Sequence, residues 1–169
     1  MSSNQVLGVV IAVAVAGLVI ARQVQPRPVS ARALLLLPLV LIVIGVVEVT
    51  RAVPKGQSLT GTEGAWLAAD LALGAVFGVA RGFTVRLYEQ AGELWRRGTK
   101  VTVALWGVTI AARIVISILG HHHGAGKVLD DAVLLTLGIT LGAQSGIVMF
   151  RGSRSGVPFA VRDRGGLGP

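Results

Sequence analysis

Five long apolar runs constrain this chain more than any other feature of its sequence. They cover residues 5–21, 34–49, 65–80, 101–119 and 128–150. A helix of about 20 apolar residues, within a working range of about 17–25, crosses the hydrocarbon core of a bilayer. Backbone that faces lipid must satisfy its own hydrogen bonds, so each run is predicted to form a helix. The predicted fold class is therefore an all-α membrane protein, a bundle of five transmembrane helices in one domain, 1–150.

The composition agrees with this class and disfavours others. Charged residues make up 14% of the 169-residue chain and hydrophobic residues 53%, whereas soluble domains carry about 25% charged residues. The net charge of +8 lies between the apolar runs, so we expect it to face membrane lipids and not nucleic acid. The chain has no cysteine, which excludes disulfides and thiol chemistry of its own.

The distribution of Lys and Arg predicts the orientation. Most of the 16 Lys and Arg residues lie in the loop after the first run, in the loop after the third run and in the tail. Such loops stay in the cytoplasm, so we expect the N-terminus outside and the C-terminus inside a bacterial cytoplasmic membrane. No Lys or Arg precedes the first run, which favours a retained helix over a cleaved signal peptide. The tail, 151–169, is expected to be a disordered basic cytoplasmic segment.

The loop between the third and fourth runs carries its own pattern. Val85 and Leu87 on one side, and Leu94 and Trp95 on the other, flank a short stretch that contains Gly92. Alternation around a glycine-containing turn predicts a small cytoplasmic β-hairpin. A helix that continues from the third run is the alternative.

The same region resembles a known family. The residues that carry the likeness are those of 79–87 and 92–100, together with Leu105-Trp106 and Ala112-Arg113. They resemble the CcdC-like family of small bacterial membrane proteins, which are frequent in actinobacteria. The likeness extends over about 6–150 and is most specific over 81–113. It implies several transmembrane helices and a name taken from cytochrome c biogenesis; the family has no established reaction and no catalytic residues to transfer to this chain.

Among the ionisable residues inside the runs, which also include Asp130 and Asp131, the candidates for a polar functional site are Glu48, Asp70 and Arg113. Each costs about 2.5–3.5 kcal/mol at the centre of a membrane helix. Helical rise places Asp70 and Arg113 at nearly the same depth on adjacent antiparallel helices. We predict that they form an ion pair in the outer half of the bundle, with Glu48 near the same level. Two roles remain open, a pair that fixes helix packing and a proton or anion site that opens outward.

Histidines in the predicted outer loop are weak candidates for a metal site. His121, His122 and His123 are consecutive, and Asp130 and Asp131 follow close by. Imidazole and carboxylate groups bind several transition metals. Three consecutive side chains point in different directions, however, so a polar turn between two helices is the alternative. The sequence identifies no cofactor.

Two further patterns concern lipids and helix packing. The basic residues around the hairpin are candidates for binding anionic lipid or phosphate: Arg81, Arg86, Arg96, Arg97 and Lys100. Glycines recur every four residues in two runs, at Gly74 and Gly78 and at Gly138, Gly142 and Gly146. This spacing lets another helix approach closely. We expect the partner helix in the same chain, and a homodimer is the alternative.

These observations rank three classes of function. No nucleotide-binding loop, nucleophile elbow, zinc-protease motif or dinucleotide fingerprint occurs, so an enzyme is disfavoured. The leading hypothesis is a non-enzymatic partner or assembly factor that acts with another membrane protein, as the resemblance implies. The second is a small transporter or a protein that binds a cofactor or lipid, using Glu48, Asp70 and Arg113. A membrane enzyme is third.

Overall fold

The structure is a computed structural model that describes residues 27–53 and 58–159. The elements, in chain order, are β1 (Arg27–Pro28), α2 (Ala31–Ala52), α3 (Gly61–Thr84), β2 (Arg86–Gln90), β3 (Glu93–Arg97), α4 (Lys100–His122), α5 (Gly126–Asp131) and α6 (Val133–Ser153). Helices dominate the described residues, as the sequence predicts. The first predicted span, 5–21, lies outside them.

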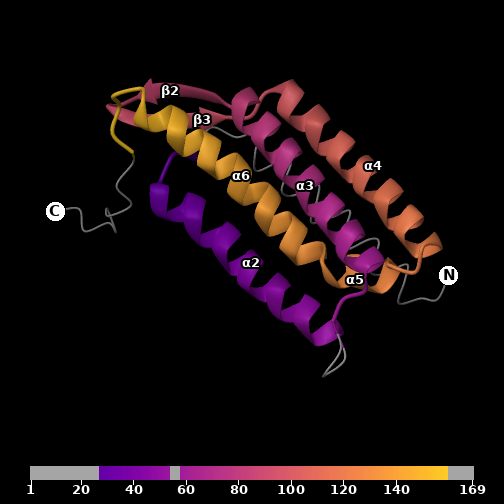
Figure 1. The fold of residues 1–169 in the computed structure, drawn as a ribbon. Coiled ribbons are helices and arrows are strands. Elements are labelled where there is room, and N and C mark those ends of the chain that lie inside the picture. The colour runs from indigo at the N-terminus through magenta and orange to yellow at the C-terminus, as the bar shows by residue number, and fades with distance from the viewer. Residues whose placement is uncertain (1–26, 54–57, 160–169) are drawn as a thin grey trace, which may run out of the picture.

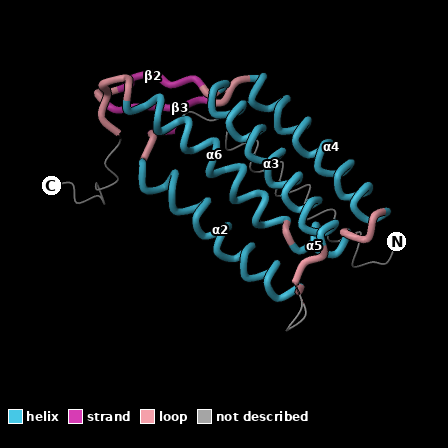
Figure 2. Tube along the Cα trace, viewed as in Figure 1, coloured by secondary structure: helices cyan, strands magenta, loops and turns pink. Residues whose placement is uncertain are grey.

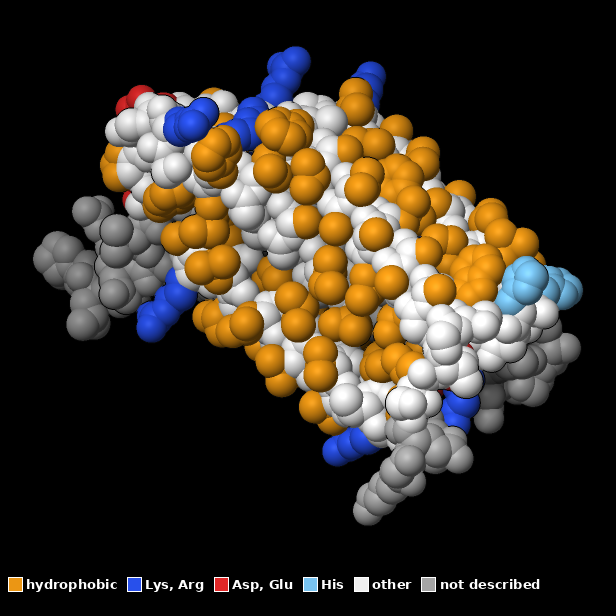
Figure 3. Space-filling view, in the orientation of Figure 1, with side chains coloured by type: hydrophobic (Ala, Val, Ile, Leu, Met, Phe, Trp, Pro, Cys, Tyr) orange, Lys and Arg blue, Asp and Glu red, His pale blue; other side chains and the backbone are white. Residues whose placement is uncertain are grey.

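Four of these helices, α2, α3, α4 and α6, are long and apolar enough to cross a membrane. Many large hydrophobic side chains on them are exposed, and Figure 3 shows these side chains covering the helices while Lys and Arg stand mainly toward the two ends. Apolar surface of this extent would be unfavourable in water. The chain is therefore an integral membrane protein with several spans.

The four long helices lie side by side with α6 in the interior of the row. α6 packs against α2 on one side and α3 on the other, and α4 packs on the far side of α3 (Figure 1). The strands lie at one end of this bundle and α5 lies at the other (Figure 2). These two ends are called the sheet end and the α5 end below.

Glycines allow α3 to approach α6 closely, as their spacing predicts. A Cβ atom at Gly74 would lie 2.7 Å from Thr140 Oγ1, and a Cβ at Gly78 would meet the backbone oxygen of Thr140. Gly82, which the sequence analysis did not include, continues the row, since a Cβ there would lie 2.6 Å from the Cβ of Ile147. The partner of this glycine face is a helix of the same chain.

The glycines of α6 differ in how closely α2 approaches them. A Cβ at Gly138 would lie 2.8 Å from the backbone nitrogen of Ile42, whereas one at Gly142 would keep an ordinary 3.6 Å from Pro38. Gly146 has no neighbouring atom within 4 Å. Four residues exceed one turn of about 3.6 residues, so the row rotates by roughly 40° at each step. The close approach is therefore confined to Gly138, and Gly146 faces outward.

The hairpin predicted between the third and fourth spans is present as β2 and β3. Tyr88 lies opposite Trp95, and the turn residues Ala91 and Gly92 have φ values of 55° and 76°. Positive φ at both central residues matches the right-handed twist of a two-residue hairpin. β1 adds a third strand beside β3, in the order β1-β3-β2, which the sequence analysis does not predict.

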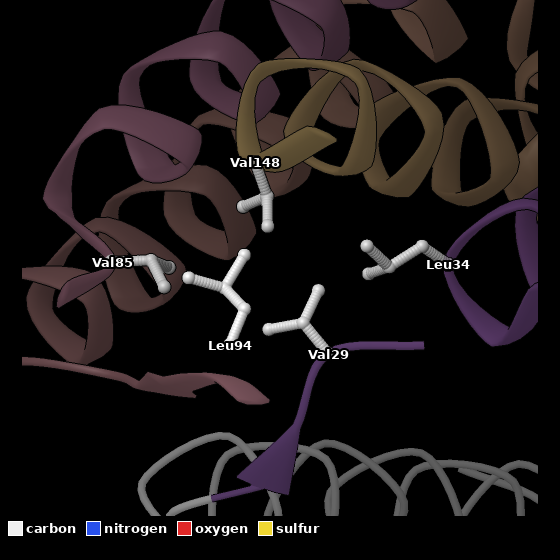
Figure 4. Close-up of a cluster of buried hydrophobic side chains, with 5 residues drawn as sticks. All are labelled: Val29, Leu34, Val85, Leu94 and Val148. Carbon is white, nitrogen blue, oxygen red and sulfur yellow. The ribbon is translucent and has the colours of Figure 1, made fainter. Parts of the chain in front are cut away.

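A hydrophobic cluster joins the sheet to the helices. Its buried members are Val29, Leu34, Val85, Leu94 and Val148, and Figure 4 shows Leu94 reaching from the sheet into the space between the others. Leu34 and Val148 lie in α2 and α6, Leu94 lies in β3, and Val29 and Val85 lie just before α2 and just after α3. The sheet is therefore held on the bundle by side-chain burial as well as by its connections to α3 and α4.

The segment after α6 differs from the disordered tail expected for 151–169. α6 continues to Ser153, and the backbone N–H of Leu94 donates to the oxygen of Pro158 at 3.1 Å. Val157 and Phe159 pack against the hydrophobic cluster. These two apolar side chains explain why the segment is ordered through 159; residues 160–169 lie outside the described part of the chain.

Arg151, near the end of α6, caps the end of α3. Its Nη1 donates to the carbonyl oxygens of Gly82, Phe83 and Val85 at 2.8, 3.0 and 2.9 Å. The last carbonyls of a helix have no partner within the helix, and a cation suits the negative end of the helix dipole. The end of α3 is therefore completed by a residue about 70 positions later.

The fifth predicted run, 128–150, corresponds to two helices and not to one. α5 ends at Asp131, Ala132 caps it, and α6 begins at Val133. Asp130 and Asp131 thus lie in a short helix at the α5 end, outside the span formed by α6. The chain turns just before α5, at Gly124, whose φ is 81°, while His121 and His122 belong to the last turn of α4 and not to a loop.

Candidate functional site

Toward the α5 end, Asp70 of α3 and Arg113 of α4 form the ion pair that the sequence predicts. Arg113 Nη1 lies 2.7 Å from Asp70 Oδ2, and only 2% of the Asp70 side chain is exposed. The hydroxyl of Thr136 in α6 donates to the same carboxylate oxygen at 2.6 Å. A buried carboxylate is tolerated only with such donors, and here they come from two different helices.

Arg113 also connects the pair to α5. Its Nη2 donates to the carbonyl oxygen of Leu129 at 3.2 Å. Four elements, α3, α4, α5 and α6, therefore meet at one polar cluster. The sequence analysis missed Thr136, because a threonine in a membrane helix commonly bonds to its own backbone and so gives no distinct signal.

A small cavity lies beside the pair. Its volume is about 40 Å³, and Ser117 and Asp130 line it together with Asp70 and Arg113. A polar cavity of about 10–15 Å³ or more can hold a water molecule. The cavity is thus large enough for water beside the ion pair and too small for an organic cofactor.

Glu48 does not join this cluster. The Glu48 side chain is exposed, and its neighbours Gly45 and Val49 are buried. Glu48 therefore lies at the exposed edge of the α2 face on which Gly45 contacts Leu135 of α6. Of the three residues predicted to form a polar cluster, Asp70 and Arg113 do so, and the third member is Thr136 and not Glu48.

His121 and His123 contact different partners. His121 Nδ1 lies 2.8 Å from the carbonyl oxygen of Ser117, and its Nε2 lies 3.3 Å from Asp130 Oδ2. The ring of His123 stacks on Trp66, with centroids 5.5 Å apart. Within residues 27–53 and 58–159, no group of three or more His, Cys, Asp or Glu side chains is placed to hold a metal ion.

At the sheet end, three of the five predicted basic residues line one groove. The groove has a volume of about 520 Å³ and is lined by Arg86, Arg97, Gly98, Thr99, Lys100, Val101 and Val103. It lies at the N-terminus of α4, whose dipole favours anions. Its lining holds three cations and no carboxylate, so its electrostatic preference is for a negatively charged group. We call it the basic groove.

The other two basic residues, Arg81 and Arg96, do not line the basic groove. Arg96 lies on β3, opposite Leu87. Arg81 is 0% exposed, contrary to the surface position expected for it. The reason is that α3 continues to Thr84, so that Arg81 lies within a helix and not in a loop. Its guanidinium lies over the ring of Trp106, 3.9 Å from the centroid.

Comparison with known proteins adds no family. The chain matches no protein-family model, no curated protein sequence and no solved structure. The resemblance to the CcdC-like family therefore stays a prediction. Functional inference rests on the polar cluster and on the basic residues at the sheet end.

Proposed function

We propose that this protein is a non-enzymatic membrane protein that binds anionic phospholipid headgroups in the basic groove. The observation that carries this proposal is the convergence of Arg86, Arg97 and Lys100 on one groove without a carboxylate. Cations near a membrane surface attract anionic lipids by about 1 kcal/mol each. Three of them, at a helix N-terminus, favour a headgroup phosphate over a zwitterionic or neutral group.

The surroundings of the groove suit a lipid. Val101 and Val103 line it together with the cations, and Val101 is 56% exposed. The apolar side chains can contact an acyl chain, while the adjacent cations contact the headgroup of the same lipid. The excess of Lys and Arg in alternate segments favours the sheet end as the cytoplasmic end in a bacterial inner membrane, where anionic lipids are available.

The same proposal gives the Asp70–Arg113 pair a structural role. Its donors and acceptors come from α3, α4, α5 and α6, and the adjacent cavity has room for water only. The pair therefore supports helix packing better than it supports transport or cofactor binding. A role as partner or assembly factor for another membrane protein, as the family resemblance implies, stays a prediction, and lipid binding is compatible with it.

Neutralising the groove is expected to remove lipid selectivity. The variant Arg86→Gln, Arg97→Gln, Lys100→Gln should lose roughly 100-fold in affinity for phosphatidylglycerol, because three attractions of about 1 kcal/mol each are lost. Native mass spectrometry of protein released from nanodiscs of mixed phosphatidylcholine and phosphatidylglycerol measures the lipid retained.

The matched control removes the same number of charges elsewhere. Arg32, Arg51 and Lys127 are exposed, and none of them lines the groove. Changing these three to glutamine should leave phosphatidylglycerol retention near that of the wild type. Equal loss in both triple variants would show that net charge, and not the groove, selects the lipid, and would refute the proposal.

A further inference from the structure

The guanidinium of Arg81 is enclosed in the bundle without an anionic partner among the described residues. Its Nε donates to the carbonyl oxygen of Phe77 at 3.4 Å, a long hydrogen bond. Nη1 and Nη2 are both buried, and neither makes a hydrogen bond within the described part of the chain. Buried polar groups are nearly always hydrogen-bonded. A buried group without a hydrogen bond costs free energy, and the cost is larger for a charged group than for a neutral one.

The contact with Trp106 offsets only part of the free-energy cost of burying the Arg81 cation. A ring attracts a cation that lies over its face, and Arg81 Cζ lies 3.9 Å from the ring centroid of Trp106. The N–H bonds of a guanidinium, however, lie in its own plane and point outward as a fork. The ring therefore covers the face of Arg81 and leaves the edge, with Nη1 and Nη2, for an oxygen ligand.

No described residue accepts a hydrogen bond from Nη1 or Nη2 of Arg81. Asp70 also lies in α3, but it is eleven residues from Arg81, roughly 16 Å along the helix. Its carboxylate is paired with Arg113. The hydroxyls of Thr84 and Thr102 lie 2.9 Å apart and bond to each other. Gln144 Oε1 of α6 is a buried acceptor that also lacks a hydrogen bond, and Arg81 does not bond to it. The Nη1 and Nη2 edge of Arg81 is therefore left for an oxygen ligand.

We propose that Arg81 anchors an internal oxyanion site that binds a phosphate group through Nη1 and Nη2. A guanidinium fork matches the oxygens of phosphate in a bidentate arrangement. The site lies at the sheet end, one turn before the end of α3. It is distinct from the basic groove, whose lining does not include Arg81, and does not depend on it.

Arg81 is fully buried in this structure, so a ligand reaches it only if the helices around it move. Three threonines hold the sheet end of the α3–α4 seam: Thr99 Oγ1 donates to Thr84 O at 3.1 Å, and the Thr84 and Thr102 hydroxyls are in contact. Binding requires the seam to part at these hydrogen bonds. Binding is therefore expected to move Trp106 of α4 relative to Arg81, which makes Trp106 a direct reporter.

A single-tryptophan variant tests the site. The chain has three tryptophans, so Trp66→Phe with Trp95→Phe leaves Trp106 alone. Its fluorescence is measured in phosphatidylcholine nanodiscs with increasing phosphatidylglycerol, and separately with increasing inorganic phosphate. We expect a saturable change in fluorescence. Arg81→Met in the same background should abolish this change, and the triple variant of the basic groove should retain it.

The two titrations distinguish the source of the phosphate. A response to phosphatidylglycerol alone identifies a lipid, and a response to inorganic phosphate identifies a free anion. No response to either, or an equal response in Arg81→Met, overturns the proposal. Should Arg81→Met not fold, Arg81→Lys keeps the charge without the fork and should weaken the response roughly tenfold; an unchanged midpoint with lysine also overturns it.

Discussion

Replacing Arg113 with glutamine is expected to lower the free energy of unfolding by about 3–5 kcal/mol. The change removes the partner of a carboxylate that is 2% exposed and leaves, among the described residues, the hydroxyl of Thr136 as its side-chain donor. It also removes the bond from Arg113 to Leu129, which connects α4 to α5. Denaturant unfolding in detergent micelles, followed by circular dichroism, measures the loss.

The double variant Asp70→Asn with Arg113→Gln separates pairing from general damage. It leaves no charge at this polar cluster, so most of the lost stability should return. Arg51→Gln, at an exposed position on α2, serves as the control and should stay within about 0.5 kcal/mol of the wild type. If the double variant is less stable than Arg113→Gln alone, the pair is not what holds these helices together.

A side chain at Gly78 is expected to separate α3 from α6. A Cβ there would meet the backbone oxygen of Thr140 and lie 3.0 Å from the Cβ of Ala143. Backbone cannot rotate away as a side chain can, so Gly78→Val should cost about 3 kcal/mol or more through overpacking. The unfolding midpoint in micelles measures the effect.

Gly146→Val is the matched control for this substitution. Gly146 lies on α6, and a Cβ there would have no neighbour within 4 Å. Both changes alter helix propensity equally, so the difference between the two variants isolates the packing contribution. Equal losses at the two positions would contradict the assignment of Gly78 to a close helix contact.

Local pattern and helical rise were sufficient to predict part of this structure. The Asp70–Arg113 pair follows from depth along two adjacent antiparallel helices. The hairpin follows from alternation around Gly92, because a two-residue turn has strict backbone requirements. Both inferences depend on residues that are close in sequence or related by a regular repeat.

Other features depend on which face of a helix meets its neighbour, and hydropathy does not specify that. Glu48 is exposed although Gly45 and Val49, three positions before it and one after it, are buried; the apolar run does not reveal which of these positions meets α6. Arg81 was expected in a loop because a charge ends an apolar run, whereas α3 continues to Thr84. The pairing of β1 with β3 joins Arg27 to Arg96, and two residues carry too little pattern to predict a partner so far along the chain.

The position of α6 has a consequence for how this bundle is made. In the described part of the chain, the helix that enters the membrane last lies between two that enter earlier, α2 and α3. Until α6 arrives, the glycine faces of those helices and the carboxylate of Asp70 have no partner among the described spans except Arg113. If the spans enter the bilayer in chain order, α2 has none of the other long described helices to pack on until α6 is inserted, whereas α3 and α4 can already pack on each other.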